Sequence, residues 1–308
     1  MKRPIKVNIF FLILILLQVF GGYIIRPISK VIKFTVASSL LTTQLMFLIL
    51  PVIIYFIITR QSIKETLRFN KIKIRSIGLI AVMGFLFVPV GMFLGQVTSF
   101  FFYNNVQDVF NKLQSLPLGL MLGVVALTPA LCEEITMRGV VLSGYNGSKL
   151  WKAALINGFL FAVLHLNPPQ FLYALVLGVM LAYVVRITNS IFASMIIHFI
   201  FNGTNTLLSW WSMKVNSTAA IKKSQAMLNN TSAKIMATVF LGVIAIIAVA
   251  AIVTLIKELI KDNKENLNNV NLLPSGSAEV MLLKDKIAAA VPVVISVVIY
   301  FLLVMKRI

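Results

Sequence analysis

Residues 118–142 read LGLMLGVVALTPALCEEITMRGVVL, an apolar run whose only charged residues are Glu133, Glu134 and Arg138. A run of about 20 mostly apolar residues is long enough to cross the hydrocarbon core of a bilayer as a helix. Charged side chains at that depth are costly and are retained mainly where they have a function. The stretch therefore predicts a membrane-spanning helix that carries a chemical site.

The composition predicts the same fold class for the rest of the chain. The sequence is 59% hydrophobic and 12% charged, whereas soluble domains contain roughly 25% charged residues. We expect an all-α polytopic membrane protein with about eight or nine transmembrane helices. The predicted spans are residues 8–25, 34–58, 77–102, 118–142, 151–166, 171–187, 191–211, 235–256 and 287–305.

Residues 1–6 are basic and precede an apolar run, as in a signal peptide. The run continues to Ile25 without a small-x-small cleavage site, so it is predicted to be the first transmembrane helix. Residues 1–115 would form N-terminal helices, 116–211 a helix bundle with the site, and 212–308 C-terminal helices with a polar loop. The single cysteine, Cys132, excludes an internal disulfide and favours a small buried hydrophobe over a reactive thiol.

The net charge of +19 lies in short loops between apolar runs, which favours contact with anionic lipid over nucleic acid. Cytoplasmic loops carry an excess of Lys and Arg. If all predicted spans cross the membrane, 17 Lys and Arg residues lie on the same side as the N-terminus and 10 lie on the other side. The 17 fall in residues 2–6, 60–75, 149–152, 186, 257–264 and 284–286, and the 10 fall in residues 26–33, 112, 214–234 and 306–307. The bias predicts a cytoplasmic N-terminus.

Several connecting segments give weaker predictions. Residues 59–76 are predicted either to lie on the membrane surface or to form a solvated basic loop, and residues 103–115 to form a short amphipathic helix. The polar, Asn-rich residues 257–286 are predicted to be a flexible loop. Glycines spaced four apart predict close helix contacts, and two such pairs occur: Gly91 with Gly95, and Gly119 with Gly123.

The acidic run offers a candidate general base. Glu134 and Arg138 are four residues apart, so they share a helix face and can pair. Glu133 points about 100° away and is left free to face a substrate. We expect Pro129, one turn upstream, to kink the helix and to free backbone groups near the site. A purely structural ion pair remains the alternative.

Both histidines of the chain lie in apolar stretches. Phe161 and His165 are four residues apart, as are His198 and Asn202, so each pair shares one helix face. His198 and Asn202 could together stabilise an oxyanion. Each could instead serve packing, as a hydrogen-bonded histidine or an interhelical asparagine.

Helix geometry places these groups at a similar depth. If residues 151–166 and 171–187 form a hairpin, a rise of about 1.5 Å per residue puts Glu133 about 15 Å, His165 about 21 Å, His198 about 12 Å and Asn202 about 18 Å below one membrane face. All four then lie in one band about 10 Å deep.

The motifs Glu133-Glu134-x-x-x-Arg138, Phe161-x-x-x-His165 and His198-x-x-x-Asn202 resemble the three signatures of the CPBP family. The family includes CAAX prenyl endopeptidases of the Rce type and bacteriocin-processing or Abi-type intramembrane proteases. The resemblance covers roughly residues 116–211. It implies an intramembrane endopeptidase whose site opens toward the cytoplasm.

The resemblance also implies roles for the residues. Glu133 and His165 would activate the attacking water, and His198 and Asn202 would stabilise the oxyanion. Glu134, Arg138 and Phe161 would shape the site. Family members are named metalloproteases, so the cofactor stays open between a divalent metal such as zinc and none. A zinc set would be Glu133, His165 and His198, although the H-E-x-x-H spacing is absent.

Two other functions are compatible with these residues. An ion-coupled transporter could use Glu133, His165 and His198 as a relay, although the polar groups form a band rather than a path. A non-catalytic immunity or scaffold protein could keep the motifs intact. The expected partners are the lipid bilayer and a peptide or membrane-protein substrate, with the oligomeric state open. The Lys-, Asn- and Ile-rich composition favours a bacterial plasma membrane.

Overall fold

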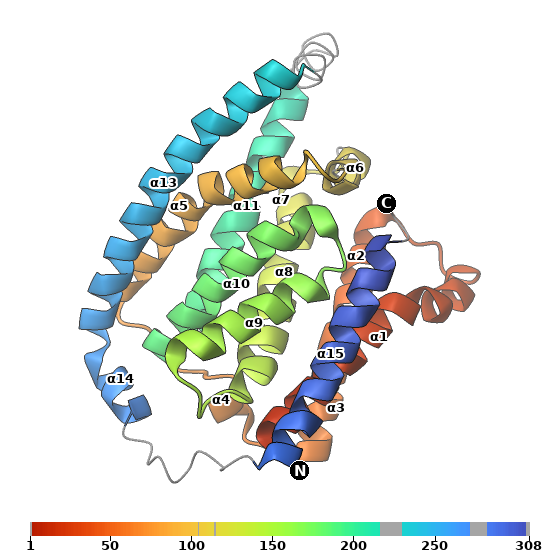
Figure 1. The fold of residues 1–308 in the computed structure, drawn as a ribbon. Helices are drawn as coiled ribbons and strands as arrows, with labels where there is room; N and C mark the ends of the chain where they lie inside the picture. Colours follow the sequence, from red (N-terminus) through yellow and green to blue (C-terminus); the bar gives the residue numbers. More distant parts are fainter. Residues whose placement is uncertain (1, 104, 114, 216–229, 272–281, 306–308) are drawn as a thin grey trace.

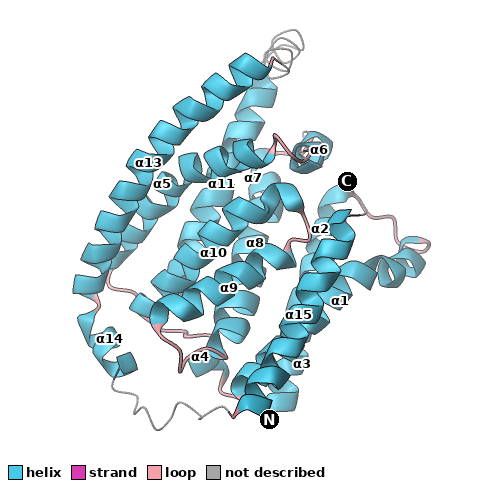
Figure 2. Ribbon diagram, viewed as in Figure 1, coloured by secondary structure: helices cyan, strands magenta, loops and turns pink. Residues whose placement is uncertain are grey.

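The computed structural model describes residues 2–103, 105–113, 115–215, 230–271 and 282–305, and these form helices with no strand (Figure 2). In these residues eight segments are long and apolar enough to span a membrane, so the predicted all-α polytopic fold is confirmed. The segments are α1 (Arg3–Ser29), Val36–Thr59, α5 (Ile74–Thr98), Leu118–Val141, α10 (Pro168–Thr188), Ile191–Ser212 within α11 (Ile191–Val215), α13 (Thr231–Asp262) and α15 (Leu283–Met305). The apolar helix α9 (Leu150–Leu164) is shorter.

Two of these spans change helix type along their length. Val36–Thr59 consists of α2 (Val36–Gln44), the π-helical segment η1 (Leu45–Ile49) and α3 (Leu50–Thr59). Leu118–Val141, here named the acidic span, consists of α7 (Leu118–Met121), π-helical η2 (Leu122–Leu127), α8 (Thr128–Glu134) and π-helical η3 (Ile135–Val141).

The segments η1 and η2 each precede a proline in the first turn of the next helix, Pro51 in α3 and Pro129 in α8. Proline lacks an N–H and its ring clashes with the carbonyl four residues earlier. In η2 the wider turn is held by Thr128, whose N–H and hydroxyl both bond to the Gly123 carbonyl. The acidic span thus accommodates Pro129 through a π turn, a feature often found at functional sites.

The central helices pack around the acidic span (Figure 1). Helices α9 and α10 form the predicted hairpin, α11 packs against η2 and α8, α13 lies along α5, and α15 lies along α1. In the hairpin a Cβ on Gly178 would lie 2.8 Å from the Cα of Gly158, so the two backbones touch.

The predicted glycine contacts are confirmed only in part. A Cβ on Gly91 would lie 2.6 Å from the Phe201 ring, so Gly91 is a site of close helix contact. The prediction is wrong for the other three glycines, because a Cβ would meet no described atom within 4 Å there; these are Gly95, Gly119 and Gly123.

The segment between α3 and α5 is neither a surface element nor a solvated loop throughout. It contains α4 (Ile63–Thr66) and then turns inward, and Arg68 is buried. The Arg68 guanidinium donates to the Arg138 carbonyl and to Asn146 Oδ1. Burial, with the nearby Arg186 charge, lowers the pKa of Arg68 to about 9. Arg186 is also buried and donates to the carbonyls of Tyr145 and Asn146.

Two further predictions concern polar segments. Residues 103–115 contain the predicted amphipathic helix, α6 (Asn105–Leu113). The prediction of a flexible loop over 257–286 is wrong for the described residues at both of its ends, because α13 continues to Asp262, α14 (Lys264–Asn271) follows and α15 begins at Leu283. Asn266 of α14 donates to the Thr188 carbonyl and ties this helix to α10. Residues 272–281 lie outside the described residues.

The bundle has two opposite ends, and short helices and helix ends lie at each of them (Figure 1). The start of α1, α4 and α14 lie at one end, named the N-terminal face. Helix α6 and the end of α15 lie at the opposite end, named the α6 face. The division of the chain into three parts stays a prediction.

Candidate active site

The four predicted catalytic residues come from three helical segments and line one cavity of about 720 Å³. Glu133 comes from the acidic span, His165 from the end of α9, and His198 and Asn202 from α11. Phe161 and Gln44 also line this cavity. The depth argument is therefore consistent with the structure: helices distant in sequence bring these groups to one place.

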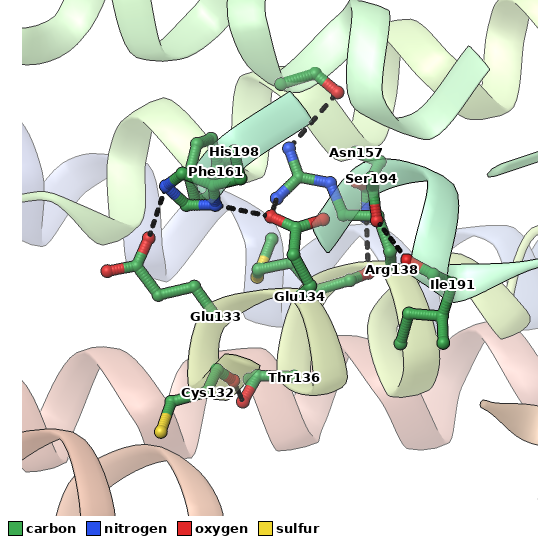
Figure 3. Close-up of polar contacts among 12 residues, drawn as sticks. Cys132, Glu133, Glu134, Thr136, Arg138, Asn157, Phe161, Ile191, Ser194 and His198 are labelled. Carbon is green, nitrogen blue, oxygen red and sulfur yellow. Dashed lines mark hydrogen bonds and ion pairs between the residues drawn. The ribbon is translucent and has the colours of Figure 1, made fainter. Parts of the chain in front are cut away.

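Glu134 and Arg138 form the predicted pair, with Glu134 Oε1 2.9 Å from an Arg138 guanidinium nitrogen (Figure 3). Both side chains are fully buried. The same carboxylate oxygen lies 2.8 Å from His198 Nδ1. The Arg138 guanidinium stacks over the Phe161 ring at 4.1 Å and donates to the Gly178 carbonyl. A buried charge needs such partners, so this network can hold Arg138 and the His198 ring in place.

Glu133 points away from the Glu134–Arg138 pair, toward the other ring nitrogen of His198 and the cavity (Figure 3). Its Oε2 lies 4.0 Å from His198 Nε2, and its Oε1 accepts a hydrogen bond of 3.0 Å from Gln44 Nε2. A separation of 4.0 Å is too long for a direct hydrogen bond, but one oxygen atom beside both groups could bridge them.

Gln44 is a site residue that the sequence reasoning missed. It ends α2, directly before η1, and contacts Glu133 from a span outside the three motifs. The available signal was a single glutamine in an apolar stretch seven residues before Pro51. A polar group at that depth needs a partner, but the sequence does not say which one.

The surroundings of His165 assign its ring protons. Nδ1 lies 2.8 Å from the Phe161 carbonyl oxygen. That oxygen only accepts, so Nδ1 carries the proton and Nε2 is free to accept one. The next residue, Leu166, has a φ of 47°, a left-handed conformation that is costly for leucine. This sharp turn ends α9 at His165.

Asn202 has one structural contact besides facing the cavity. Its Nδ2 donates to the Val125 carbonyl at 3.3 Å, the group that a residue with an N–H at position 129 would bond in a regular α-helix. Pro129 has no N–H, so Asn202 takes its place. The interhelical role left open for Asn202 is therefore present, and the second N–H of its amide remains for another acceptor.

The proposed zinc set does not fit this geometry. Among the described residues, no group of three or more His, Cys, Asp or Glu side chains is arranged to hold a metal ion. Glu133 Oε2 and His198 Nε2 lie 4.0 Å apart, whereas two ligand atoms about 2.0–2.2 Å from a tetrahedral zinc ion lie closer together than that. We therefore derive no catalytic step through a metal.

The cavity extends from these groups to the α6 face, where Asp108, Phe110 and Lys112 of α6 line it. The N-terminus lies at the opposite face (Figure 1). The N-terminus and the α6 end of the cavity therefore lie at opposite ends of the bundle.

Residues 115–204 match the family model described as "Type II CAAX prenyl endopeptidase Rce1-like". The match contains all three motifs, and the family resemblance is confirmed for this region. Comparison with curated proteins and with solved structures finds no match.

Proposed function

From the match to this protease family, we propose that the chain is an intramembrane endopeptidase that hydrolyses a peptide bond in a membrane-associated peptide or protein. One observation carries the proposal. Glu133, His165, His198 and Asn202 line the same cavity, and Glu133 and His198 face each other across 4.0 Å. Such a cavity can hold an extended peptide next to an acid–base pair.

Glu133 and His165 activate the water in this mechanism. The water oxygen bonds to the scissile carbonyl carbon while its proton passes to Glu133 or to His165 Nε2. The carbonyl oxygen becomes an oxyanion, which accepts hydrogen bonds from the free Asn202 N–H and from Nε2 of protonated His198. The oxyanion then re-forms the C=O double bond, the C–N bond breaks, and the captured proton moves to the leaving amine.

Glu133 is the better base of the two acids. Glu134 is fully buried, and its Oε1 already contacts both Arg138 and His198. Glu133 lines the cavity and has one carboxylate oxygen directed at His198. Glu134 and Arg138 act by fixing His198, as a positioning pair.

We place the protein in a bacterial plasma membrane with the cavity open to the cytoplasm, which puts the N-terminus on the other side. The Lys and Arg excess opposes this orientation, and it falls only to 15 against 10 when Arg68 and Arg186, which are buried against backbone carbonyls, are set aside. Those two arginines have a structural reason for their position.

Cysteine labelling decides the orientation. Cys132 is the only cysteine, so Lys64→Cys and Lys112→Cys can be compared in a Cys132→Ala background. An impermeant maleimide should label Lys64→Cys in intact cells, and Lys112→Cys only after permeabilisation. The reverse pattern places the cavity mouth outside the cell.

The function itself is tested with purified protein in detergent. Wild type and Glu133→Ala are incubated with a peptide library, with and without a chelator, and products are identified by mass spectrometry. Cleavage that depends on Glu133 and resists the chelator supports the proposal. Full native function of Glu133→Ala would instead support an immunity or scaffold role, and chelator-sensitive cleavage restored by zinc would overturn the metal-free mechanism.

A further inference from the structure

A second, partly open cavity of about 170 Å³ lies beside the first. It is lined by Gln18, Gln44, Leu48, Glu133, Leu164 and His165. Glu133, His165 and Gln44 line both cavities, whereas His198 and Asn202 line only the larger one. The groups assigned to water activation are therefore the ones that border both spaces.

Two glutamines make this small cavity polar at membrane depth. Gln18 lies near the middle of α1, and its side chain makes no hydrogen bond with any described residue. Gln44 Nε2 is held by Glu133, while Gln44 Oε1 is buried and has no hydrogen-bond partner among the described residues. The carboxylate can only accept, so the amide must be oriented this way. Unpaired polar groups at such depth are costly, and bound water is a common partner for them.

The size and lining of the cavity suit water. A water molecule occupies roughly 30 Å³ in the liquid, so 170 Å³ has room for about five. A buried water needs two to four polar partners. The Gln18 amide, the Glu133 carboxylate and His165 Nε2 supply them.

We infer that this cavity holds the nucleophilic water and delivers it to Glu133 from the side opposite the substrate. The inference rests on the proposed peptidase function and adds Gln18 and Gln44 as water-positioning residues. Substrate in the larger cavity presents its carbonyl to His198 and Asn202, and water reaches the carbonyl carbon past Glu133 and His165. Separate spaces let the substrate exclude bulk solvent without displacing the nucleophile.

Kinetics of three glutamine variants test the inference. Gln18→Leu keeps the side-chain size and does not touch Glu133, so kcat should fall about tenfold, the value of one hydrogen bond, while KM stays unchanged. Gln44→Leu should lower kcat further, because Glu133 also loses a donor. Gln96→Leu, in α5 and outside the lining of both cavities, is the matched control and should leave kcat unchanged. Gln18→Asn should restore much of the lost activity.

Wild-type kcat in both Gln18→Leu and Gln44→Leu would overturn the inference, and so would a rise in KM alone, which indicates a substrate subsite. An experimental structure with visible solvent gives a readout that does not depend on activity. Ordered water should lie between the Gln18 amide and His165 Nε2 in wild type and should be reduced in Gln18→Leu. Absence of this water in wild type overturns the inference, whereas absence of Glu133-dependent cleavage with the water in place overturns only the peptidase function.

Discussion

The acidic span and α13 can both cross a membrane, but their surroundings differ. The acidic span contains two π-helical segments, a proline and a buried ion pair. Helix α13 runs from Thr231 to Asp262 as one α-helix, and only 17% of its most apolar stretch is buried. Irregular backbone and charge are tolerated at membrane depth only where protein or a cavity surrounds them. The comparison indicates that irregular backbone and buried charge occur in the span that packs among other helices, whereas the more exposed α13 stays regular.

The largest expected difference is in kcat, between a variant of an acid in the acidic span and a variant of an acid in α13. Glu133→Gln should lower kcat by about 10²- to 10⁴-fold, because a general base is removed. Glu258→Gln alters an acid of α13 that pairs with Arg75 and Lys261 on the exposed side and should leave kcat unchanged. Peptide cleavage assays on both proteins in detergent measure the difference. Equal losses would mean that the effect is not specific to the site.

The next comparison concerns two arginines that pair with acids. Arg138→Met leaves Glu134 as a buried charge without its guanidinium and should lower the free energy of unfolding by about 3–5 kcal/mol. Arg75→Met removes an exposed pairing to α13, since the Arg75 side chain is 67% exposed, and should cost at most about 1 kcal/mol. Denaturant unfolding in detergent gives both values. Similar losses in the two variants would show that burial does not determine how much an ion pair contributes to the free energy of unfolding.

Glycines give a third, smaller contrast. In Gly178→Ala the new Cβ meets the Gly158 backbone at 2.8 Å, so α9 and α10 must separate at a cost of about 1–3 kcal/mol. Gly242→Ala on α13 meets only the edge of the Phe93 ring, at 3.1 Å. The gain in helix propensity should offset that contact to within about 0.5 kcal/mol. Thermal unfolding of the two variants tests this, and a neutral Gly178→Ala contradicts the close hairpin.

The smallest effect is expected on the exposed face of α13. Ile246 is 72% exposed, so Ile246→Ala should change the free energy of unfolding by less than about 0.5 kcal/mol and leave cleavage unaltered. The same unfolding and cleavage measurements apply. A loss well above that value would reveal a protein partner packed on this face.

The fold class and the site-bearing helices were predictable from the sequence because their signals are local. Apolar length identifies a span, and a spacing of four residues places Glu134 beside Arg138 whatever the remaining helices do. The segment Lys264–Asn271 was misread as a loop because its composition is polar. Its helix is held in part by Asn266 and the Thr188 carbonyl, a contact between residues far apart in the chain.

The sequence by itself determined the membrane spans, the ion pair and the residue types from which a site could be built. The tertiary structure decided which of these residues meet. Gln44 donates a hydrogen bond to Glu133, Asn202 donates to the Val125 carbonyl in place of the N–H that Pro129 lacks, and Arg68 turns inward to the Arg138 carbonyl. Helical periodicity fixes neighbours within one helix. Contacts between helices depend on the packing of the whole bundle, which no local pattern contains.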